Sequence, residues 1–467
     1  MSTLRSSAQL CAALRRSLEA ESGPALSQWL GHARARCQAH VEPIELAGLE
    51  RWSLDPSRLA LAHDSGQFFS VIGAKVELGW GSAASRRVTQ PLIAQDEVGI
   101  LGLLMRIADG RAEFLVQAKF EPGDPQPVQL GPTLQATRSN YSRAHGGRLP
   151  AGVSEFLAPR SSAVVVDVEL PEQAEFFLAK RNRNMVVLVD HEVELSSDER
   201  FRWATLAELR ETLAQPNAVN MSLRSVLACA LAVAIEPPSA ATTSTAATTL
   251  AGLSWSWDLD RAPLDELIGW TWSARGLVAD GASADLRAGL VFVEVTASER
   301  EVPRWTQPML TRAAVVPIDL YVHTRAGQWW LLARISLDAG QREGPRLGPS
   351  AGPASSPIAS ARATLRFDTE LAEDGGRLLA LRHRYRVWEL VDPPSPAVEP
   401  GCVWIPLAEV PELLRRGLID VELRTCLLAL MMLHDCPRVP VLGGDQRPAS
   451  SVTNVTASTA SSRKHPG

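Results

Sequence analysis

Residues 114–145 read FLVQAKFEPGDPQPVQLGPTLQATRSNYSRAH and combine amides, hydroxyls, guanidinium groups, a lysine and a tyrosine in one short segment. Apolar side chains occupy every second position from Phe114 to Phe120, whereas Gln117, Lys119 and the following Glu121 fall on the opposite side. Successive side chains of a strand face opposite sides of its sheet, so this alternation predicts a strand with one buried face. We interpret the other face as the wall of a polar pocket.

The sequence EPGDP, at 121–125, predicts a chain reversal after this strand. Pro122 and Pro125 restrict φ, and Gly123 offers a permissive position. The run from Ser139 to Arg143 then adds a hydroxyl, an amide, a phenol and a guanidinium group. Loops carry functional residues more often than strands do, which favours a site here. The alternative is a solvated strand face, which is the commoner origin of a Lys/Glu alternation.

Bulk composition restricts the class of protein. The chain has 467 residues, 45% apolar and 21% charged, which allows two or more domains with their own cores. A net charge of −5 argues against a general nucleic-acid binder. We find neither an apolar run of the roughly 20 residues that span a bilayer nor a secretory leader, so we predict a cytoplasmic protein without a membrane partner. The six cysteines form no CxxC pair, and we expect Cys229 and Cys426 to lie in the core.

The chain also repeats itself with a period near 200 residues, in conserved order. The matched segments are TQPL at 89–92 with TQPM at 306–309, LGPT at 130–133 with LGPS at 347–350, FLAKRNRN at 177–184 with LLALRHRY at 378–385, and Leu223-Arg224 with Leu423-Arg424. Strands come first in each copy and helices last, which indicates an α+β fold duplicated in tandem. The expected helices that close the copies are 206–213 and 222–234 in the first, and 407–416 and 422–433 in the second.

We therefore expect five parts of the chain. They are an N-terminal helical segment at 1–40, a first repeat with the working site at 41–235, a linker at 236–250, a second repeat with a diverged site at 251–440 and a disordered tail at 441–467. The linker, EPPSAATTSTAATTL, has a composition that buries little apolar surface.

The two copies differ in their polar residues. We align Gln117, Lys119 and Glu121 with Leu332, Arg334 and Ser336, and the run 139–143 with 356–360. The second copy then lacks the amides, the phenol and the arginine, although its apolar positions are kept. A purely structural motif has no reason to diverge in this way, so we assign the working site to the first copy.

FFSVIGAKVE, QAKFEPG, QLGPTLQATRSNYSR and FLAKRNRNMVV, together with the tandem layout, closely resemble the NDP-hexose 2,3-dehydratases of deoxysugar biosynthesis. The resemblance covers about residues 44–433. It implies two Nudix-like α/β-sandwich repeats and removal of water across C2 and C3 of a dTDP-4-keto-6-deoxyhexose. It also implies an NADPH-dependent 3-ketoreductase partner, a homodimer and a place in antibiotic biosynthesis. The chain departs from the family at 86–91, where a tryptophan is missing, and at 349–352, where a PTxQ block is degraded.

Such an elimination needs a base for the C3 proton, a group that stabilises the enolate oxygen and an acid for the departing 2-hydroxyl. The 4-keto group is the electron sink, so we expect no metal and no cofactor. The sequence has no dinucleotide loop, no phosphate loop and no Nudix carboxylate box, which disfavours a Nudix-type hydrolase. The candidates for proton transfer are Lys119, Glu121 and Tyr141, and the identity of the base stays open. An inactive nucleotide-sugar-binding relative is the alternative function.

The candidates for substrate binding fall into three chemical groups. Guanidinium groups suit the diphosphate, amides and hydroxyls suit the sugar or the thymine edge, and indoles suit stacking. The residues are Arg143, Arg181, Arg183, Arg334, Arg382 and Arg384; Gln135, Ser139, Asn140, Tyr141 and Ser142; and Trp52 and Trp270. The tryptophans are equally expected in the core, and Arg181 and Arg183 could form a solvated edge with Lys180. The matched arginines fit either a repeated structural role or two nucleotide sites.

Overall fold

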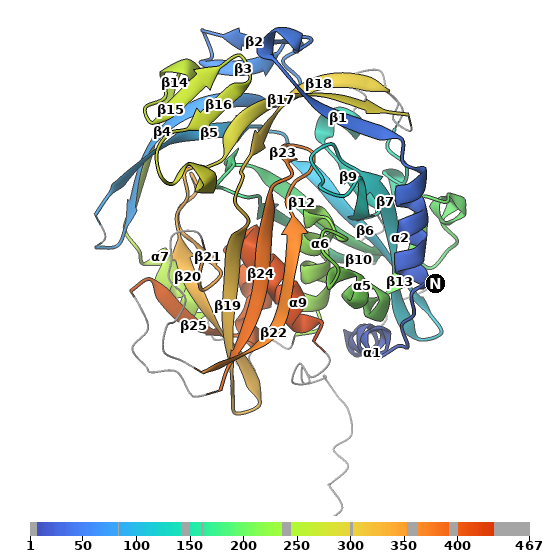
Figure 1. The fold of residues 1–467 in the computed structure, drawn as a ribbon. Coiled ribbons are helices and arrows are strands. Elements are labelled where there is room, and N and C mark those ends of the chain that lie inside the picture. The colour runs from blue at the N-terminus through green and yellow to red at the C-terminus, as the bar shows by residue number, and fades with distance from the viewer. Residues whose placement is uncertain are drawn as a thin grey trace, which may run out of the picture.

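The computed structural model describes residues 7–82, 84–141, 149–159, 163–235, 244–298, 302–352, 362–391 and 400–433. Two repeats of an α+β fold build it, and each has a small sheet, a large sheet and helices that follow them (Figure 1). This confirms the duplicated α+β fold expected from the sequence. None of the helices in these residues is long and apolar enough to cross a membrane.

The first repeat holds one smaller sheet and one larger sheet. The small sheet contains β2 (Trp52–Asp55), β3 (Ala60–His63), β4 (Ser70–Trp80), β5 (Arg86–Ala94) and β11 (Phe177–Leu178). The large sheet contains β6 (Gly99–Ala108), β7 (Arg111–Phe120), β8 (Val128–Gly131), β9 (Leu134–Ala136), β10 (Val164–Pro171), β12 (Arg181–Leu188) and β13 (Phe201–Thr205). Its helices are α1 (Ser7–Leu18), α2 (Ala25–Arg36), α3 (Arg138–Tyr141), α4 (Ser154–Leu157), α5 (Leu206–Leu213) and α6 (Met221–Ala232).

The second repeat copies this plan. Its small sheet contains β15 (Trp270–Ser273), β16 (Gly276–Ala279), β17 (Gly289–Ala297), β18 (Arg304–Thr311) and β23 (Leu378–Leu379). Its large sheet contains β19 (Val316–Arg325), β20 (Gln328–Ser336), β21 (Arg346–Gly348), β22 (Ala363–Ala372), β24 (Arg382–Leu390) and β25 (Cys402–Pro406). Its helices are α7 (Thr245–Ala251), α8 (Val410–Arg415) and α9 (Val421–Met431).

Each repeat lends one strand to the small sheet of the other. β1 (Ala39–Ile44) pairs antiparallel with β17, from Ala39 opposite Ala297 to Ile44 opposite Phe292. β14 (Trp255–Ala262) pairs in the same way with β4, from Trp255 opposite Trp80 to Ala262 opposite Gly73. Separating the repeats would therefore expose two strand edges, each with a full row of unpaired backbone groups.

Two tryptophans also form hydrogen bonds across the boundary between the two repeats. The Trp52 indole N–H donates to the Thr306 carbonyl at 2.9 Å, and the Trp270 indole N–H donates to the Thr89 carbonyl at 2.8 Å. Their exposed fractions are only 8% and 7%. Of the two expected roles, this placement supports the core role. The stacking role expected as an alternative has no exposed ring face to support it.

Helices α6 and α9 pack against each other at the centre, between the two large sheets (Figure 1). Each carries a fully buried arginine that reaches into the other repeat. Arg224 donates to the Ala372 carbonyl at 2.9 Å and to Glu373 at 3.2 Å. Arg424 donates to the Pro171 carbonyl at 2.7 Å. Their Nε atoms donate to Thr425 and Ser225 of the facing helix, so the contacts are reciprocal.

The helices expected from sequence are present, but the linker expectation is wrong in part. α5 spans the expected residues, and α6, α8 and α9 differ from expectation only at their ends. Residues 245–251 form α7, whose Ala246 and Ala247 are completely buried. Composition misled here because alanine is small yet packs well, and Ser244 caps this helix by accepting from the Ala247 N–H. The expected tail at 441–467 lies outside the described residues. Cys229 and Cys426 are buried in the core, as predicted.

Our alignment of the two copies at the polar strand is also wrong, by two residues. Gln117 pairs with Gly131, and the matching pair in the second repeat is Arg334 with Gly348. Arg334 is therefore equivalent to Gln117, and Lys119 is equivalent to Ser336. Glu121 then corresponds to Asp338, so a carboxylate is retained at this position in the second repeat.

Removing one central arginine tests the joint between the repeats. We expect Arg224→Met to lower the free energy of unfolding by about 3–5 kcal/mol, because Glu373 stays buried without its cationic partner. Urea unfolding of the full chain measures this. Arg384→Met is the control, since Arg384 pairs with Asp368 at a half-exposed surface and should change stability little. Equal destabilisation by the two variants would contradict the central role of Arg224.

Candidate active site

Strand β7 presents two different faces, as its sequence predicts. Phe114 and Val116 lie in the main core, whereas Leu115 lies in a separate cluster on the opposite side. Lys119 extends from that second face, and its Nζ lies 3.4 Å from Glu121 Oε1. Gln135 of β9 donates to the same oxygen at 2.9 Å, so the predicted amide, cation and carboxylate do come together.

This group is largely shielded from solvent. The side chains of Lys119 and Glu121 are 14% and 7% exposed, respectively. Asn220, the N-cap of α6, donates to the Gln135 side-chain oxygen at 3.3 Å. The cluster is thus connected to the start of the central helix.

A loop of the second repeat closes the cluster from the other side. The Gly123 N–H donates to the Gly375 carbonyl, and the Ala380 N–H donates to the Gly123 carbonyl, both at 2.7 Å. Glycine is required at 123 because a Cβ there would overlap the Leu378 carbonyl oxygen. The close approach of two segments of the same chain therefore explains the glycine at position 123, rather than the permissive φ that the sequence suggested. The first-repeat site is built by both repeats.

Carboxyl groups meet at this contact. Burial, followed by the nearby charge of Glu121, raises the pKa of Asp374 to about 6. Burial also raises the pKa of Asp124, with further contributions from Glu121 and Asp374. Both side-chain oxygens of Asp124 are buried and have no hydrogen-bond partner. Arg377 is the nearby second-repeat cation, and its guanidinium lies 4.3 Å from the centre of the Phe69 ring. We define the first-repeat cluster as Lys119, Glu121, Asp124, Gln135, Asp374 and Arg377.

Lys180 lies beside this cluster and is buried, with 7% of its surface exposed. Its Nζ donates to the Glu97 carbonyl oxygen. Burial lowers the pKa of Lys180 to about 8, against the opposing effect of the Glu172 carboxylate. The interpretation of Lys180 as part of a solvated edge is therefore wrong.

A cavity of about 460 Å³ opens next to Lys180 and holds another predicted residue, Tyr141. Its lining residues are Asp96, Glu97, Val98, Gly99, Ile100, Arg138, Tyr141, Leu157 and Arg183. Tyr141 comes from the short helix α3, in the part of the chain expected to be a loop. Two guanidinium groups, two acidic residues and a phenol line this cavity, so it offers both hydrogen-bond donors and acceptors to a polar ligand.

The predicted arginines are mostly held in ion pairs. Arg183 binds Asp167 through two hydrogen bonds of 2.6 Å, and Arg384 binds Asp368 through two of 2.7 Å. These matched pairs bridge equivalent strands, which supports the repeated structural role. Among these arginines, only Arg183 also lines a described cavity.

The remaining predicted arginines lie apart from the cluster. Arg181 contacts Glu169 and Glu343, and Arg382 lies 3.4 Å from Glu370. Arg334 lies on β20, opposite Gly348. Ser142 and Arg143 fall outside the described residues. Ser139 and Asn140 belong to α3, and only their backbone is described.

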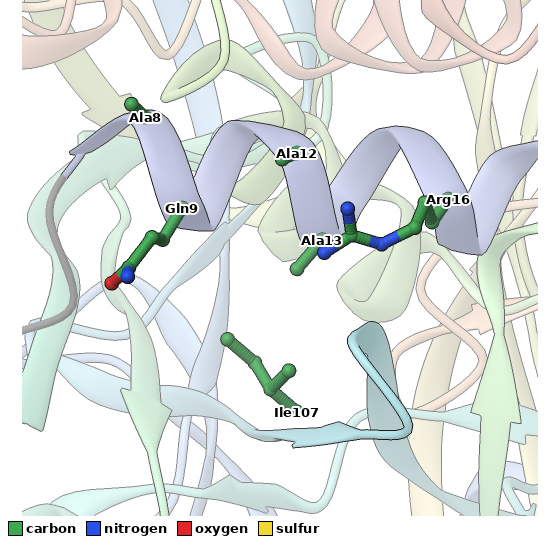
Figure 2. Close-up of a pocket in the computed structure, with 6 residues that line it drawn as sticks. All are labelled: Ala8, Gln9, Ala12, Ala13, Arg16 and Ile107. Carbon is green, nitrogen blue, oxygen red and sulfur yellow. The ribbon is translucent and has the colours of Figure 1, made fainter.

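A second cavity, of about 360 Å³, lies between α1 and β6 (Figure 2). Ala8, Ala12 and Ala13 line it together with Ile107, and Arg16 is its one charged group. The Arg16 Nε is already bonded to the Gly110 carbonyl. This hollow has no proton-transfer chemistry. Across the described residues, no group of three or more His, Cys, Asp or Glu side chains is placed to hold a metal ion.

Sequence reasoning missed Asp124, Asp374, Arg377 and Lys180 as members of the site. The signals were present but weak. Gly375-Gly376 flanked by Asp374 and Arg377 is a local oddity of the second repeat. Lys180 was grouped with its arginine neighbours, although it precedes β12 and points inward.

Comparison with known proteins shows which family the sequence matches. A sequence model described as NDP-hexose 2,3-dehydratase matches residues 24–230 and 251–431. A dTDP-4-dehydro-6-deoxy-alpha-D-glucopyranose 2,3-dehydratase of Amycolatopsis orientalis is 34% identical over 442 residues, or 88% of this chain and 90% of the relative. Proteins of the same name from Saccharopolyspora spinosa and Streptomyces violaceoruber are each 32% identical over 87% of this chain, and over 90% and 96% of their own lengths.

The raised pKa of Asp374 makes stability depend on pH. The folded state holds this proton up to about pH 6, whereas the unfolded carboxyl loses it near pH 4, so stability falls between those values as pH rises. Asp374→Asn mimics the protonated form, and we expect it to stabilise the chain at pH 7.5 by about 1–3 kcal/mol but not at pH 4. Thermal unfolding at both pH values measures this. Equal effects at both would contradict the buried-carboxyl assignment.

Proposed function

The chain belongs to the NDP-hexose 2,3-dehydratase family, and from this premise we propose that it removes water across C2 and C3 of a dTDP-4-keto-6-deoxyhexose. The observation that carries the proposal is the shielded cluster of cation, carboxylate and amide at Lys119, Glu121 and Gln135. A site of this kind excludes water while holding both a proton donor and an acceptor next to a bound ketone.

The reaction itself is a balanced elimination. A base takes the C3 proton, and the electrons of that C–H bond form an enolate with the 4-keto oxygen. The enolate then expels the 2-hydroxyl, which leaves with a proton as water, and the 4-ketone is restored beside a new C2–C3 double bond. The resulting 3-enol tautomerises to a 3,4-diketone. Lys119 is placed in our proposal as the donor to the enolate oxygen, and Glu121 holds it in position through their 3.4 Å pair.

The cavity lined by Tyr141 supplies the binding part of the proposal. Arg138 and Arg183 suit the diphosphate through paired N–H donors, and the Tyr141 phenol suits a hydroxyl of the sugar. Asp167 keeps the Arg183 guanidinium oriented. The 96–100 segment lines the cavity, and its Glu97 carbonyl accepts from Lys180, which faces Asp374 and Arg377 of the first-repeat cluster. We place the diphosphate of the nucleotide sugar in the cavity and its hexose toward the first-repeat cluster.

Finer features are part of the same proposal. The 3,4-diketone is reactive and must be consumed, so an NADPH-dependent 3-ketoreductase is the expected partner. The resulting deoxysugar would serve antibiotic biosynthesis, the repeats would be of Nudix-like type, and the enzyme would act as a homodimer. The mechanism above uses neither a metal nor a nicotinamide bound to this chain.

Turnover of the nucleotide sugar tests the function directly. We expect the purified chain, incubated with dTDP-4-keto-6-deoxyglucose, a 3-ketoreductase and NADPH, to yield a 2-deoxy sugar nucleotide. Lys119→Met should lower kcat by about 10²–10⁴-fold because it removes the donor to the enolate oxygen, and Glu121→Gln should lower kcat less because it removes only the group that positions Lys119. Lys75→Met, on β4, is the matched lysine control and should keep its rate. No product from the wild type, with binding of the substrate demonstrated, would leave the inactive-relative alternative standing.

Cavity variants separate binding from chemistry. Removing a guanidinium that contacts the diphosphate should raise KM by about tenfold or more and leave kcat nearly unchanged. Arg183→Ala is the test variant, and Arg384→Ala is its control, because the two arginines have matched carboxylate partners but only Arg183 lines the cavity. Steady-state kinetics gives KM and kcat for both variants and so tests whether Arg183 binds the substrate. Equal KM values for the two would remove Arg183 from the binding site.

A further inference from the structure

A buried lysine occurs in only one of the two repeats, at position 180. The pairing of Pro171 with Arg181 in the first repeat matches that of Ala372 with Arg382 in the second. The residue before each arginine is therefore equivalent, and it is Lys180 in one repeat and Leu381 in the other. Leu381 is 1% exposed and packs in an apolar core. An apolar leucine therefore meets the packing requirement at this position of the fold. The presence of a lysine in the first repeat needs an explanation other than packing.

The use of lysine in this chain points to that reason. Only four of its 47 basic residues are lysines, Lys75, Lys119, Lys180 and Lys464, and the rest are arginines. Two of the four lie at the candidate site. An arginine keeps its proton in a protein, whereas a lysine can release one when burial disfavours its charge. At position 180, where the side chain is buried, lysine can therefore exchange a proton that arginine could not.

The surroundings of Lys180 fit this use. Four ionisable groups face it, from three other segments: Glu97 before β6, Glu172 after β10, and Asp374 and Arg377 in the second-repeat loop. The Glu97 carbonyl takes one N–H of the amine, and the Glu97 segment lines the cavity proposed for the nucleotide sugar. Lys180 is therefore bonded to the backbone of a segment that lines the cavity, although its own side chain is not part of the lining.

Glu172 completes the arrangement. Asn182 donates to one of its carboxylate oxygens at 2.8 Å, while the other is buried and has no hydrogen-bond partner. Asn182 in turn accepts from the Gly99 N–H, which lies in the cavity lining. A fixed carboxylate beside a buried amine stabilises the ammonium that forms when the amine gains a proton.

We propose that Lys180 is the base that takes the C3 proton, and that Glu172 is its positioning residue. This inference rests on the proposed dehydratase function and deepens it. The lone pair of the neutral amine accepts the proton, the C–H electrons pass into the enolate, and the ammonium then returns a proton to the departing 2-hydroxyl. The amine is neutral again after one turnover, and no other reactant is consumed beyond the sugar.

Hydrogen exchange at C3 isolates this step from the rest of the reaction. In D₂O the wild type should incorporate deuterium at C3 of dTDP-4-keto-6-deoxyglucose or lose water from it, as followed by NMR. Lys180→Arg keeps the charge but cannot act as a base, and we expect it to lower this rate by about 10²–10⁴-fold. Lys75→Arg is the matched control. Calorimetric binding of dTDP by Lys180→Arg shows that the site is still folded.

A spectroscopic titration gives a readout that a merely structural lysine would not move. With only four lysines, a chain labelled with ¹³C at lysine Cε gives a spectrum in which Lys180→Arg removes one assignable signal. We expect that signal to titrate near pH 8, because burial favours the neutral amine. Below the midpoint Lys180 is protonated, so kcat/KM should rise with pH through the same value. Glu172→Gln should move both midpoints downward together.

Chemical rescue tests most directly whether the amine of Lys180 is the base. Lys180→Ala removes the amine and leaves space for a small primary amine, and added amines should restore C3 exchange with a rate that rises with amine pKa. Exchange retained by Lys180→Arg, or an absence of rescue in a Lys180→Ala protein that binds dTDP, would overturn the inference while the wild type still turns over. A wild type that shows no turnover would instead overturn the proposed function.

Discussion

Two fully buried arginines, Arg224 and Arg424, impose the constraint on which the rest of the molecule depends. A guanidinium without solvent costs several kcal/mol unless it finds partners, and here each finds a backbone carbonyl of the opposite repeat. Each arginine also donates to one carbonyl of its own repeat, but its other N–H groups donate to the opposite repeat, so each core depends on the other. This joint sets α6 against α9 and thereby places the turn after β7 against the loop that holds Asp374. The candidate active site is therefore a consequence of the duplication, since one repeat alone would lack that loop.

Duplication also explains how one scaffold carries unequal sites. Features that stabilise the fold recur in both repeats, such as the Arg183–Asp167 and Arg384–Asp368 pairs. Features that serve chemistry do not recur. Lys119 is replaced by Ser336 and Lys180 by Leu381 at equivalent places, although carboxylates persist at Glu121 and Asp338. Both lysines are absent from the second repeat, which instead carries Arg334 in place of Gln117, so the two lysines rather than the acids distinguish the first-repeat cluster.

The sequence predicted correctly those features that depend on interactions between residues close together in the chain. The alternation in β7 and the helical period of α5 follow from side-chain geometry within a few residues, and the Lys119–Glu121–Gln135 cluster follows from the turn between them. The exchanged strands and the Asp374 loop have no local signal, because pairing over some two hundred residues leaves no trace in composition. The two-residue alignment error has a related cause. A slip of two leaves every side chain of a strand on its original face, so the apolar pattern is blind to it, and only the pairing of Gln117 with Gly131 reveals the register.

The two lysines at the candidate site have different immediate hydrogen-bond or ion-pair partners, and burial acts on Lys180 more strongly than its carboxylate neighbours do; our proposal assigns their roles from this difference. Lys119 lies 3.4 Å from the Glu121 carboxylate and is best suited to remain a cation that stabilises a developing enolate oxygen. Lys180 bonds to a neutral carbonyl, and burial lowers its pKa to about 8, which favours an amine that can accept a proton near neutral pH. An elimination beside a ketone needs one group of each kind. Under the proposed roles, arginine could replace Lys119 with partial loss of function but could not replace Lys180, because arginine keeps its proton; this requirement explains the lysine at position 180 in a chain so rich in arginine.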